Sequence, residues 1–405
     1  MSRYLAFLFA LLLSAATALH ASLFTDPVYV DDTKVLETLD IPSTFLRDPL
    51  FRQLKNELTT RKRAHYLAML RRGRSYIPTL RKMIAEADVP QVFLYMAMAE
   101  SHFDAHAKSS AKAVGLWQFM PKTAKIYGLQ IDRYIDERKD PVRSTEAAIR
   151  YLKRLHGMFG KWYLAALAYN CGEGRVMRAI KRAGSDDLHT LLDEKKRYLP
   201  KESRNYLRKI VSMALVANNA QLSFTKKELE LFNPSDAQRL VRVRVNGGET
   251  LEHIARQIGM TTKALKVLNP QFNYGFTPPQ KGAFINIPHS KVETFRTSYR
   301  PGKQKKMYLV HTVRKGENLS KIAYRYGISY KMIATFNKIK NGRIFPNQEL
   351  IIPIPKGSIH RYEVKPGDSI YKIAKRFGVK MATIKARNDL KSNIIHVGDR
   401  LVIPN

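Results

Sequence analysis

The chain has 405 residues, with 70 Lys and Arg against 34 Asp and Glu, which gives a formal charge of +36. At about 150 residues per domain this length predicts two or three domains, and a hydrophobic fraction of 44% excludes a wholly disordered chain. The single cysteine, Cys171, excludes a disulfide framework and any metal site built from several cysteines. The basic excess indicates an anionic partner, and by charge alone nucleic acid, a lipid surface and an acidic polymer all stay open.

The N-terminal segment has the pattern of an export signal. Arg3 precedes an apolar run, and the small residues Ala16-Thr17-Ala18 follow it. This pattern is typical of a secretory signal, so residues 1–18 are predicted to be a signal peptide, with an uncleaved anchor as the alternative. No cysteine lies near the cleavage region, so a lipoprotein is not expected. The predicted location is the periplasm or cell envelope of a Gram-negative bacterium.

A helical block with one notable glutamate follows. Residues 19–80 are predicted to be a helical lead-in region with a solvated basic face. From residue 81 to 225 apolar stretches alternate with Gly, Asn and Asp-Pro breaks, which again favours helices. The apolar run over 92–99 ends in Glu100, and desolvation there would raise the pKa of its carboxyl, as a general acid requires. From this segment alone, a glutamate that caps the helix or pairs with an arginine is the alternative.

Three further clusters place aromatic and amide side chains at helix ends, as a cleft for sugar rings requires. They are Gly115-Leu116-Trp117-Gln118-Phe119-Met120-Pro121, Ala168-Tyr169-Asn170-Cys171-Gly172, and Leu199-Pro200-Lys201-Glu202 with Tyr206. Together with Glu100 they resemble the lysozyme-like transglycosylase (SLT) domain of lytic murein transglycosylases. The resemblance implies an enzyme that cleaves the β-1,4 bond between N-acetylmuramic acid and N-acetylglucosamine without water, leaving 1,6-anhydromuramic ends.

The same resemblance implies a role for each matched residue. Glu100 matches the single catalytic acid and base of the family. The matched substrate-binding residues are Ser109, Gln118, Met120, Tyr169, Asn170, Glu202 and Tyr206. No metal and no cofactor is implied, and His102 and His106 make only a weak metal pattern. Asp104, one helical turn after Glu100, is expected on a solvated helix face, with a second catalytic carboxylate as the alternative.

The last third of the chain repeats one pattern three times. Gly248, Gly316 and Gly367 are each followed by an acidic residue, and an asparagine comes 21 residues after each glycine. Every repeat ends in Ile-Pro, and the first ends three residues late, which places a short insertion near 274–279. A strand, two helices separated by a glycine, and a final strand are predicted in each unit.

These repeats resemble LysM modules, which bind N-acetylglucosamine in peptidoglycan or chitin. Their predicted bounds are 240–289 for a divergent module 1, 308–354 for module 2 and 360–405 for module 3. The matched glycan-binding positions are Gly316, Glu317, Asn318, Gly367, Asp368 and Ser369. Module 1 has Gly248-Glu249-Thr250 there, and because of its insertion its glycan binding is the least supported of the three.

The predicted architecture is therefore multidomain, with a mainly α lysozyme-like catalytic domain over 81–225 followed by three small βααβ LysM modules. The predicted function is that of a peptidoglycan lytic transglycosylase, with peripheral association with an anionic envelope membrane as a further expectation. Export and the lack of a binding motif argue against nucleic acid. A hydrolytic muramidase and a non-catalytic cell-wall scaffold are the alternatives, and intact Glu100, Gln118 and Tyr169-Asn170 argue against the scaffold.

Overall fold

The computed structural model describes residues 32–278, 283–301, 308–326, 328, 330–339, 341–353 and 359–404. The predicted signal peptide, residues 1–18, lies outside this part of the chain. The helices within the described ranges include none with the length and apolarity that a membrane span needs. The chain divides into two compact units, residues 1–300 and 301–405.

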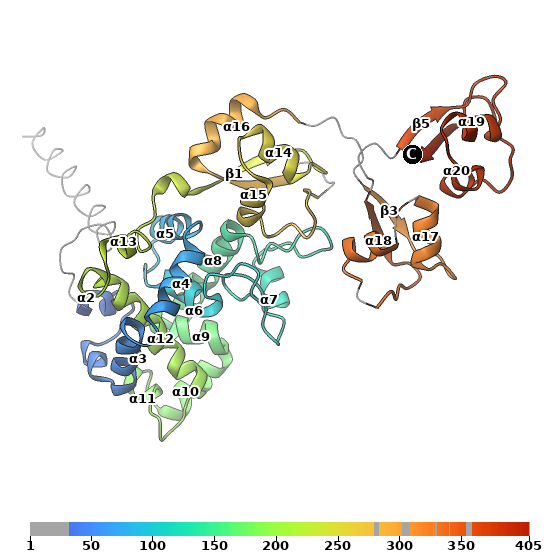
Figure 1. The fold of residues 1–405 in the computed structure, drawn as a ribbon. Coiled ribbons are helices and arrows are strands. Elements are labelled where there is room, and N and C mark those ends of the chain that lie inside the picture. The colour runs from blue at the N-terminus through green and yellow to red at the C-terminus, as the bar shows by residue number, and fades with distance from the viewer. Residues whose placement is uncertain are drawn as a thin grey trace, which may run out of the picture. The chain divides into compact units, whose positions relative to one another are not determined.

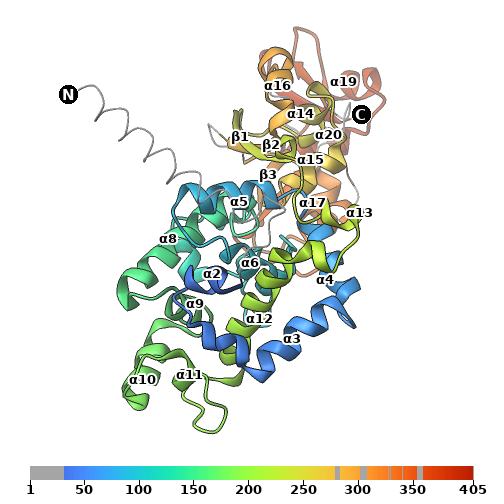
Figure 2. The ribbon, with the colours of Figure 1, turned by 90° about the vertical axis from the view of Figure 1, so that its left-hand side faces the viewer.

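The first unit is mainly helical (Figure 1). Its helices before the first strand are α2 (Asp32–Glu37), η2 (Ser43–Arg47), α3 (Pro49–Thr59), α4 (Arg63–Gly73), α5 (Ile77–Glu86), α6 (Phe93–Ser101), α7 (Pro121–Ile126), α8 (Pro141–Phe159), α9 (Trp162–Cys171), α10 (Glu173–Ala183), α11 (Leu188–Leu191), α12 (Lys201–Asn218), η3 (Ala220–Leu222), α13 (Lys226–Leu229) and η4 (Asp236–Gln238). Helix α12 packs against α3, α6 and α9, and Figure 2 shows α3 and α12 side by side.

Helix α6 is buried over almost its whole length, and Glu100 is its one partly exposed residue. Every residue of α6 except Glu100 is buried, which is the composition of a helix inside a protein core. The helix ends after Ser101 because His102 and Phe103 both take left-handed backbone angles, with φ of 55° and 56°. The expectation that Asp104 follows Glu100 by one helical turn is therefore wrong. Asp104 lies in a turn, where its carboxylate accepts a hydrogen bond from the backbone of His106.

The region predicted as a lead-in contributes to the same core. Phe51 on α3 and Tyr66 on α4 are fully buried, and the Tyr66 hydroxyl donates a 2.8 Å hydrogen bond to the carbonyl oxygen of Met213 on α12. The basic residues expected on a solvated face are indeed exposed, with Arg61 68% and Lys62 46% exposed, and both also form ion pairs with Glu57. These helices therefore pack against α12, the helix that carries Tyr206.

Module 1 closes the first unit and has the predicted order of elements. It consists of β1 (Leu240–Val245), α14 (Leu251–Gln257), α15 (Thr262–Leu268) and β2 (Ala283–Pro288), followed by η5 (His289–Lys291) and α16 (Val292–Ser298). The strands are antiparallel and pair Leu240 with Pro288 and Val245 with Ala283. Its hydrophobic cluster includes Ile135 from the helical part, so the module and the helices share packed surface.

The second unit holds modules 2 and 3, which confirm the βααβ prediction. Their elements are β3 (Tyr308–Thr312), α17 (Leu319–Tyr326), α18 (Tyr330–Phe336) and β4 (Glu349–Pro353), then β5 (Ile359–Glu363), α19 (Ile370–Arg376), α20 (Met381–Arg387) and β6 (Arg400–Pro404). Each pair of strands is antiparallel. The repeated asparagine ties the second helix to the final strand: the side chain of Asn388 accepts from Val402 N at 2.7 Å and donates to Val402 O at 2.9 Å.

Candidate active site

Glu100 meets Tyr206 where α6 and α12 pack together. The Tyr206 hydroxyl donates a 2.6 Å hydrogen bond to Oε1 of Glu100, and only 8% of Tyr206 is exposed. Burial raises the pKa of Glu100 to about 7, while the Tyr206 hydrogen bond and the charge of Lys209 pull it down and Glu202 pushes it up. A carboxyl group with this pKa is populated in both its acid and its base form at neutral pH.

Lys209 is a neighbour of Glu100 that the sequence analysis did not single out for the site. It follows Tyr206 by three residues on α12, which places both on one helix face. Its Nζ donates a 3.0 Å hydrogen bond to the carbonyl oxygen of Ala99. Burial lowers the pKa of Lys209 and the charge of Glu100 raises it. The ammonium group can therefore stabilise Glu100 in its carboxylate form.

Three of the predicted substrate-binding residues lie on one loop, residues 107–120, which we call the cleft loop. Gln118 has a left-handed backbone, with φ of 47°, and its Nε2 donates to the carbonyl oxygens of Gly115 at 2.8 Å and Ala107 at 3.3 Å. Ser109 Oγ accepts a 3.0 Å hydrogen bond from Ala113 N. Met120, just before α7, is 43% exposed. Gln118 and Ser109 thus shape the loop, and Met120 presents an apolar side chain beside it.

Tyr169 connects the cleft loop to the neighbourhood of Glu100. Its hydroxyl, at the end of α9, donates a 2.8 Å hydrogen bond to the carbonyl oxygen of Trp117. Burial raises the pKa of Tyr169 well above its usual value, and the charge of Glu100 adds to the rise. The phenol therefore stays neutral. Trp117 is fixed in turn by its indole nitrogen, which donates to Thr145 Oγ1 at 2.9 Å.

Asn170 and Glu202 lie at adjoining helix ends. Asn170 Oδ1 accepts a 2.7 Å hydrogen bond from the hydroxyl of Ser203, in the first turn of α12. Glu202 is exposed beside it, yet it is near enough for its charge to raise the pKa of Glu100.

The cysteine next to Asn170 does not have the properties of a nucleophile. Burial raises the pKa of the Cys171 thiol, which disfavours the thiolate that a nucleophilic role would need.

A cluster of four aromatic rings, which sequence spacing did not reveal, includes Tyr169 and closes on itself, because the ring centroids of Phe119 and Tyr169 lie 6.2 Å apart. The ring centroids of Tyr169 and Tyr151 are 5.0 Å apart, those of Tyr151 and Tyr127 are 4.9 Å apart, and those of Tyr127 and Phe119 are 6.5 Å apart. These residues come from four separate segments, so no local motif could have pointed to them. In the described stretches, no group of three or more His, Cys, Asp or Glu residues has the arrangement of a metal site.

The acidic residues predicted to bind glycan in modules 2 and 3 contact their own loops. Glu317 Oε2 lies 2.8 Å from His311 Nε2 and accepts a 2.8 Å hydrogen bond from Arg314 N. Asp368 Oδ2 accepts from the hydroxyl of Tyr362 at 2.6 Å and from Lys365 N at 2.9 Å. Both carboxylates thus hold the turn in front of the first helix.

The other predicted groove residues of these modules shape the same loops. Asn318 Oδ1 accepts a 2.8 Å hydrogen bond from Lys321 N, and Ser369 Oγ accepts a 3.2 Å hydrogen bond from Lys372 N, which is the geometry of an N-cap. Gly316 and Gly367 share a φ of 82°, a conformation that glycine adopts without strain. The two loops therefore share the glycine conformation and the N-cap hydrogen bond.

Three family profiles match the chain. Residues 80–191 match the transglycosylase SLT domain, residues 311–353 and 362–404 match the LysM domain, and residues 239–304 match the LysM-like domain of lytic transglycosylase MltD. The chain is 31% identical over 360 residues to the membrane-bound lytic murein transglycosylase D of Escherichia coli K12, an alignment that covers 82% of this chain and 76% of that protein.

Two further similarities are shorter or weaker. The peptidoglycan transglycosylase gp16 of Escherichia phage T7 is 37% identical over 121 residues, which are 29% of this chain and 9% of that protein. The solved 70 kDa soluble lytic transglycosylase of Escherichia coli is 18% identical, with a TM-score of 0.33 and coverage of 55% of this chain and 36% of that chain.

Proposed function

Because this chain belongs to the lytic murein transglycosylase D family, we propose that Glu100 is the catalytic acid and base of a peptidoglycan lytic transglycosylase. The observation that carries this assignment is the buried Tyr206–Glu100 hydrogen bond of 2.6 Å together with a Glu100 pKa of about 7. A carboxyl group that must first donate and then accept a proton works best when its pKa lies near the working pH.

The reaction uses one carboxyl group twice. Protonated Glu100 gives its proton to the glycosidic oxygen between N-acetylmuramic acid and N-acetylglucosamine, and the bond from that oxygen to C1 of the muramic residue breaks. The substrate's acetamido oxygen stabilises the positive charge at C1. Glu100, now a carboxylate, takes the proton of the muramic 6-hydroxyl, whose oxygen closes the 1,6-anhydro ring on C1. The proton count balances and no water is consumed, in contrast to glycosidases with two carboxylates.

Tyr206 and Lys209 support Glu100 between these two steps. After proton donation the new carboxylate accepts the Tyr206 hydrogen bond and is attracted by the Lys209 ammonium. Both interactions favour the charged form of Glu100, and burial opposes it. Tyr206, predicted as a substrate-binding residue, is thus better assigned as a positioning residue. Substrate binding falls to the predicted residues Ser109, Gln118, Met120, Tyr169, Asn170 and Glu202.

Modules 2 and 3 keep the enzyme on its polymeric substrate. Their loops after the repeated asparagines, Asn337 and Asn388, carry exposed apolar side chains, with Phe345 67% and Ile394 68% exposed. We assign these two loops, together with the turns at Gly316 and Gly367, to the binding of N-acetylglucosamine. The excess of basic residues adds a general attraction to the carboxylates of peptide stems and to anionic envelope membranes. We place the protein accordingly in the Gram-negative envelope, exported by residues 1–18.

Product analysis tests this function. Purified sacculi digested with the mature chain should release muropeptides with 1,6-anhydromuramic ends, identified by mass spectrometry. Reducing muramic ends in their place would assign a hydrolytic muramidase, and no release with retained binding would assign a scaffold. The matched control is Glu100→Gln, which keeps the shape of the side chain, should still bind sacculi, and should release nothing.

A further inference from the structure

Module 1 fills the groove in which a LysM module would hold a glycan. Leu251 N donates a 2.9 Å hydrogen bond to Gly275 O, and Gly248 N donates to Pro278 O at 3.0 Å. Thr277 forms two hydrogen bonds with Glu249: its backbone nitrogen donates to Glu249 O at 2.8 Å, and its Oγ1 accepts from Glu249 N at 3.0 Å. The three-residue insertion thus pairs with the very turn that would contact the sugar.

The loop after the asparagine also faces inward in module 1. Phe276, within the insertion, is only 4% exposed. Phe276 stacks on Tyr274 with ring centroids 5.5 Å apart. The insertion of module 1 is thus packed inward around these two rings.

The same loop of module 1 is joined by backbone hydrogen bonds to the helical part of the first unit. Asp136 N donates to Gln271 O at 2.9 Å, and Asn273 N donates to Tyr134 O at 2.9 Å. Between them, Ile135 and Phe272 form an antiparallel bridge. The side chain of Asn273 adds a 3.0 Å hydrogen bond to the carbonyl oxygen of Arg133. Two loops from distant parts of the chain therefore behave as a short two-stranded ribbon.

A buried asparagine secures this contact at the start of α8. Asn286 Nδ2 donates a 3.0 Å hydrogen bond to Oδ1 of Asp140, the residue that caps α8, and both side chains are buried. The repeated asparagine clasp aligns Asn286 with Ile351 and Val402 of modules 2 and 3. Modules 2 and 3 have an aliphatic residue at this position, and module 1 has Asn286. Because a buried polar group requires a hydrogen-bond partner, the asparagine is explained by the contact of module 1 with Asp140.

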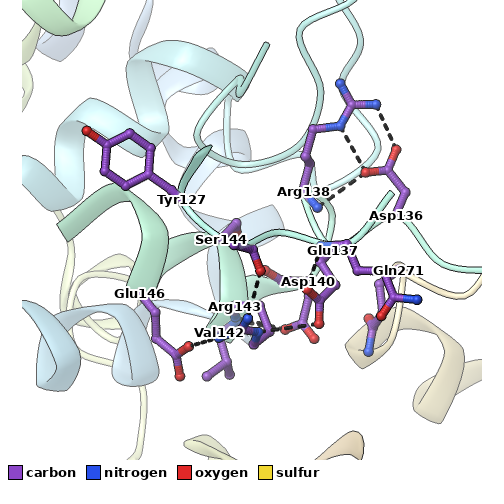
Figure 3. Close-up of polar contacts among 12 residues, drawn as sticks. Tyr127, Asp136, Glu137, Arg138, Asp140, Val142, Arg143, Ser144, Glu146 and Gln271 are labelled. Atoms are coloured by element: carbon purple, nitrogen blue, oxygen red, sulfur yellow. Dashed lines mark hydrogen bonds and ion pairs between the residues drawn. The ribbon is translucent and has the colours of Figure 1, made fainter. Parts of the chain in front are cut away.

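The segment held by module 1 also holds the cleft loop, through Arg138, whose pairing with Asp136 beside Gln271 is drawn in Figure 3. Arg138 forms two 2.9 Å hydrogen bonds with the carboxylate of Asp136. Its Nη1 donates to the carbonyl oxygens of Lys112 at 3.0 Å and Phe119 at 3.3 Å. These carbonyls lie within the cleft loop, on either side of Gly115. A chain of direct contacts thus runs from Gln271 through Asp136 and Arg138 to the loop that carries Ser109 and Gln118.

We propose that module 1 is a positioning element of the catalytic cleft, which has given up glycan binding to brace the cleft loop through Asp136 and Arg138. The proposal rests on the proposed function, since it assigns the cleft loop to substrate binding. Arg138 and Asn273 are positioning residues in this arrangement. Arg138 contacts the cleft loop, Asn273 contacts the segment that holds Arg138, and other side chains bind the sugar.

Two variants of the full chain test the proposal. Asn273→Ala removes the side-chain contact from module 1, and Arg138→Met removes the guanidinium that holds the cleft loop. Both should raise KM for short peptide-free glycan strands about tenfold, whereas a mere loss of folded enzyme would leave KM unchanged. Asn56→Ala, which changes an exposed asparagine of α3, is the matched control and should keep the wild-type KM. The double variant should resemble Arg138→Met alone, because both residues act through the same loop.

Amide hydrogen exchange gives a second result that does not depend on catalysis. Exchange of residues 107–120 should become faster in Asn273→Ala and stay at the wild-type rate in Asn56→Ala. Unchanged exchange of this loop in Asn273→Ala would overturn the proposal, even if Arg138→Met proved too unstable to study. A wild-type chain that forms no anhydro product would instead overturn the proposed function, and the exchange rates would still decide the role of module 1.

Discussion

Tyr206, which lies 106 residues after Glu100 in the chain, holds the carboxyl group of Glu100 through a 2.6 Å hydrogen bond from its buried hydroxyl. Two opposing effects meet at this contact. Burial raises the pKa of Glu100, and the donated hydrogen bond lowers it. The balance at about 7 lets one residue serve as the acid in the first step and as the base in the second.

Removing the Tyr206 hydroxyl should shift the pH dependence of the reaction. In Tyr206→Phe the carboxylate of Glu100 loses a donor, so its pKa rises above about 7. The fall of kcat on the alkaline side, where Glu100 loses the proton it must donate, should move to higher pH. The maximal kcat should drop roughly tenfold or more, because the carboxyl group is less well oriented.

The matched control for this variant is Tyr163→Phe, which loses a 2.8 Å hydrogen bond to Asp186 O without touching Glu100. The kcat–pH profile of Tyr163→Phe should keep the wild-type alkaline limb. An unshifted limb in Tyr206→Phe would show that this hydrogen bond does not set the pKa of the catalytic acid.

The pKa of Glu100 also predicts how the stability of the fold depends on pH. The pKa of about 7 in the folded state exceeds the ordinary value of 4.5, so the folded state binds this proton more tightly than the unfolded state does. Its contribution is fully present below pH 4.5 and is lost as the pH rises through 7. Glu100→Gln carries no such charge, so at pH 8 its free energy of unfolding should exceed that of the wild type by about 1–3 kcal/mol.

Urea unfolding at pH 4.5 and pH 8 measures this difference. The gap between Glu100→Gln and the wild type should nearly vanish at pH 4.5. Glu202→Gln removes a charge from an exposed neighbour and should show a much smaller pH-dependent gain. Equal stability of Glu100→Gln and wild type at both pH values would mean that Glu100 is not desolvated in the folded protein.

Much of this arrangement could be read from local sequence patterns, and the rest depends on contacts between distant segments. The apolar helix ending in Glu100 and the three βααβ repeats were predicted because their signals are periodic and local. Asp104 was misplaced because nothing local announces the left-handed backbone at His102. The contacts of Lys209 with Ala99, and of Asn286 with Asp140, join residues more than 100 positions apart, so no spacing rule reports them.

Position 115 requires glycine because the backbone of Arg138 comes too close for a side chain. The sequence motif around Gly115 does not reveal this contact. Its φ is +88°, and a Cβ atom there would lie 1.8 Å from the carbonyl oxygen of Arg138. Gly115→Ala should therefore lower the free energy of unfolding by roughly 3–5 kcal/mol, since backbone must move to relieve the overlap. Gly128→Ala is the control, because Gly128 has a φ of +75° with no atom within 4 Å of the added Cβ. That variant should lose only about 1 kcal/mol, from backbone strain alone. Similar losses in the two variants, measured by urea unfolding, would rule out the steric explanation.

The exposed apolar loops of modules 2 and 3 predict a separation of binding from catalysis. The double variant Phe345→Asp/Ile394→Asp replaces side chains that are 67% and 68% exposed, so folding should be little affected. Retention on sacculi should fall about tenfold, because both the apolar contact and part of the attraction to an anionic polymer are lost. Turnover of short peptide-free glycan strands, which need only the catalytic cleft, should stay at the wild-type rate.

The control for this pair is Leu222→Asp, which places the same charge at a 68% exposed position of the first unit and should leave retention unchanged. Salt separates the two contributions to retention. Screening between 0.1 and 0.5 M salt, a range chosen to shorten the Debye length to a few ångströms, should weaken wild-type retention without abolishing it, since the apolar contact does not depend on ionic strength. If Leu222→Asp weakened retention as much as the double variant, charge alone would hold the enzyme on the wall, and the loops of modules 2 and 3 would not be the glycan-binding surface.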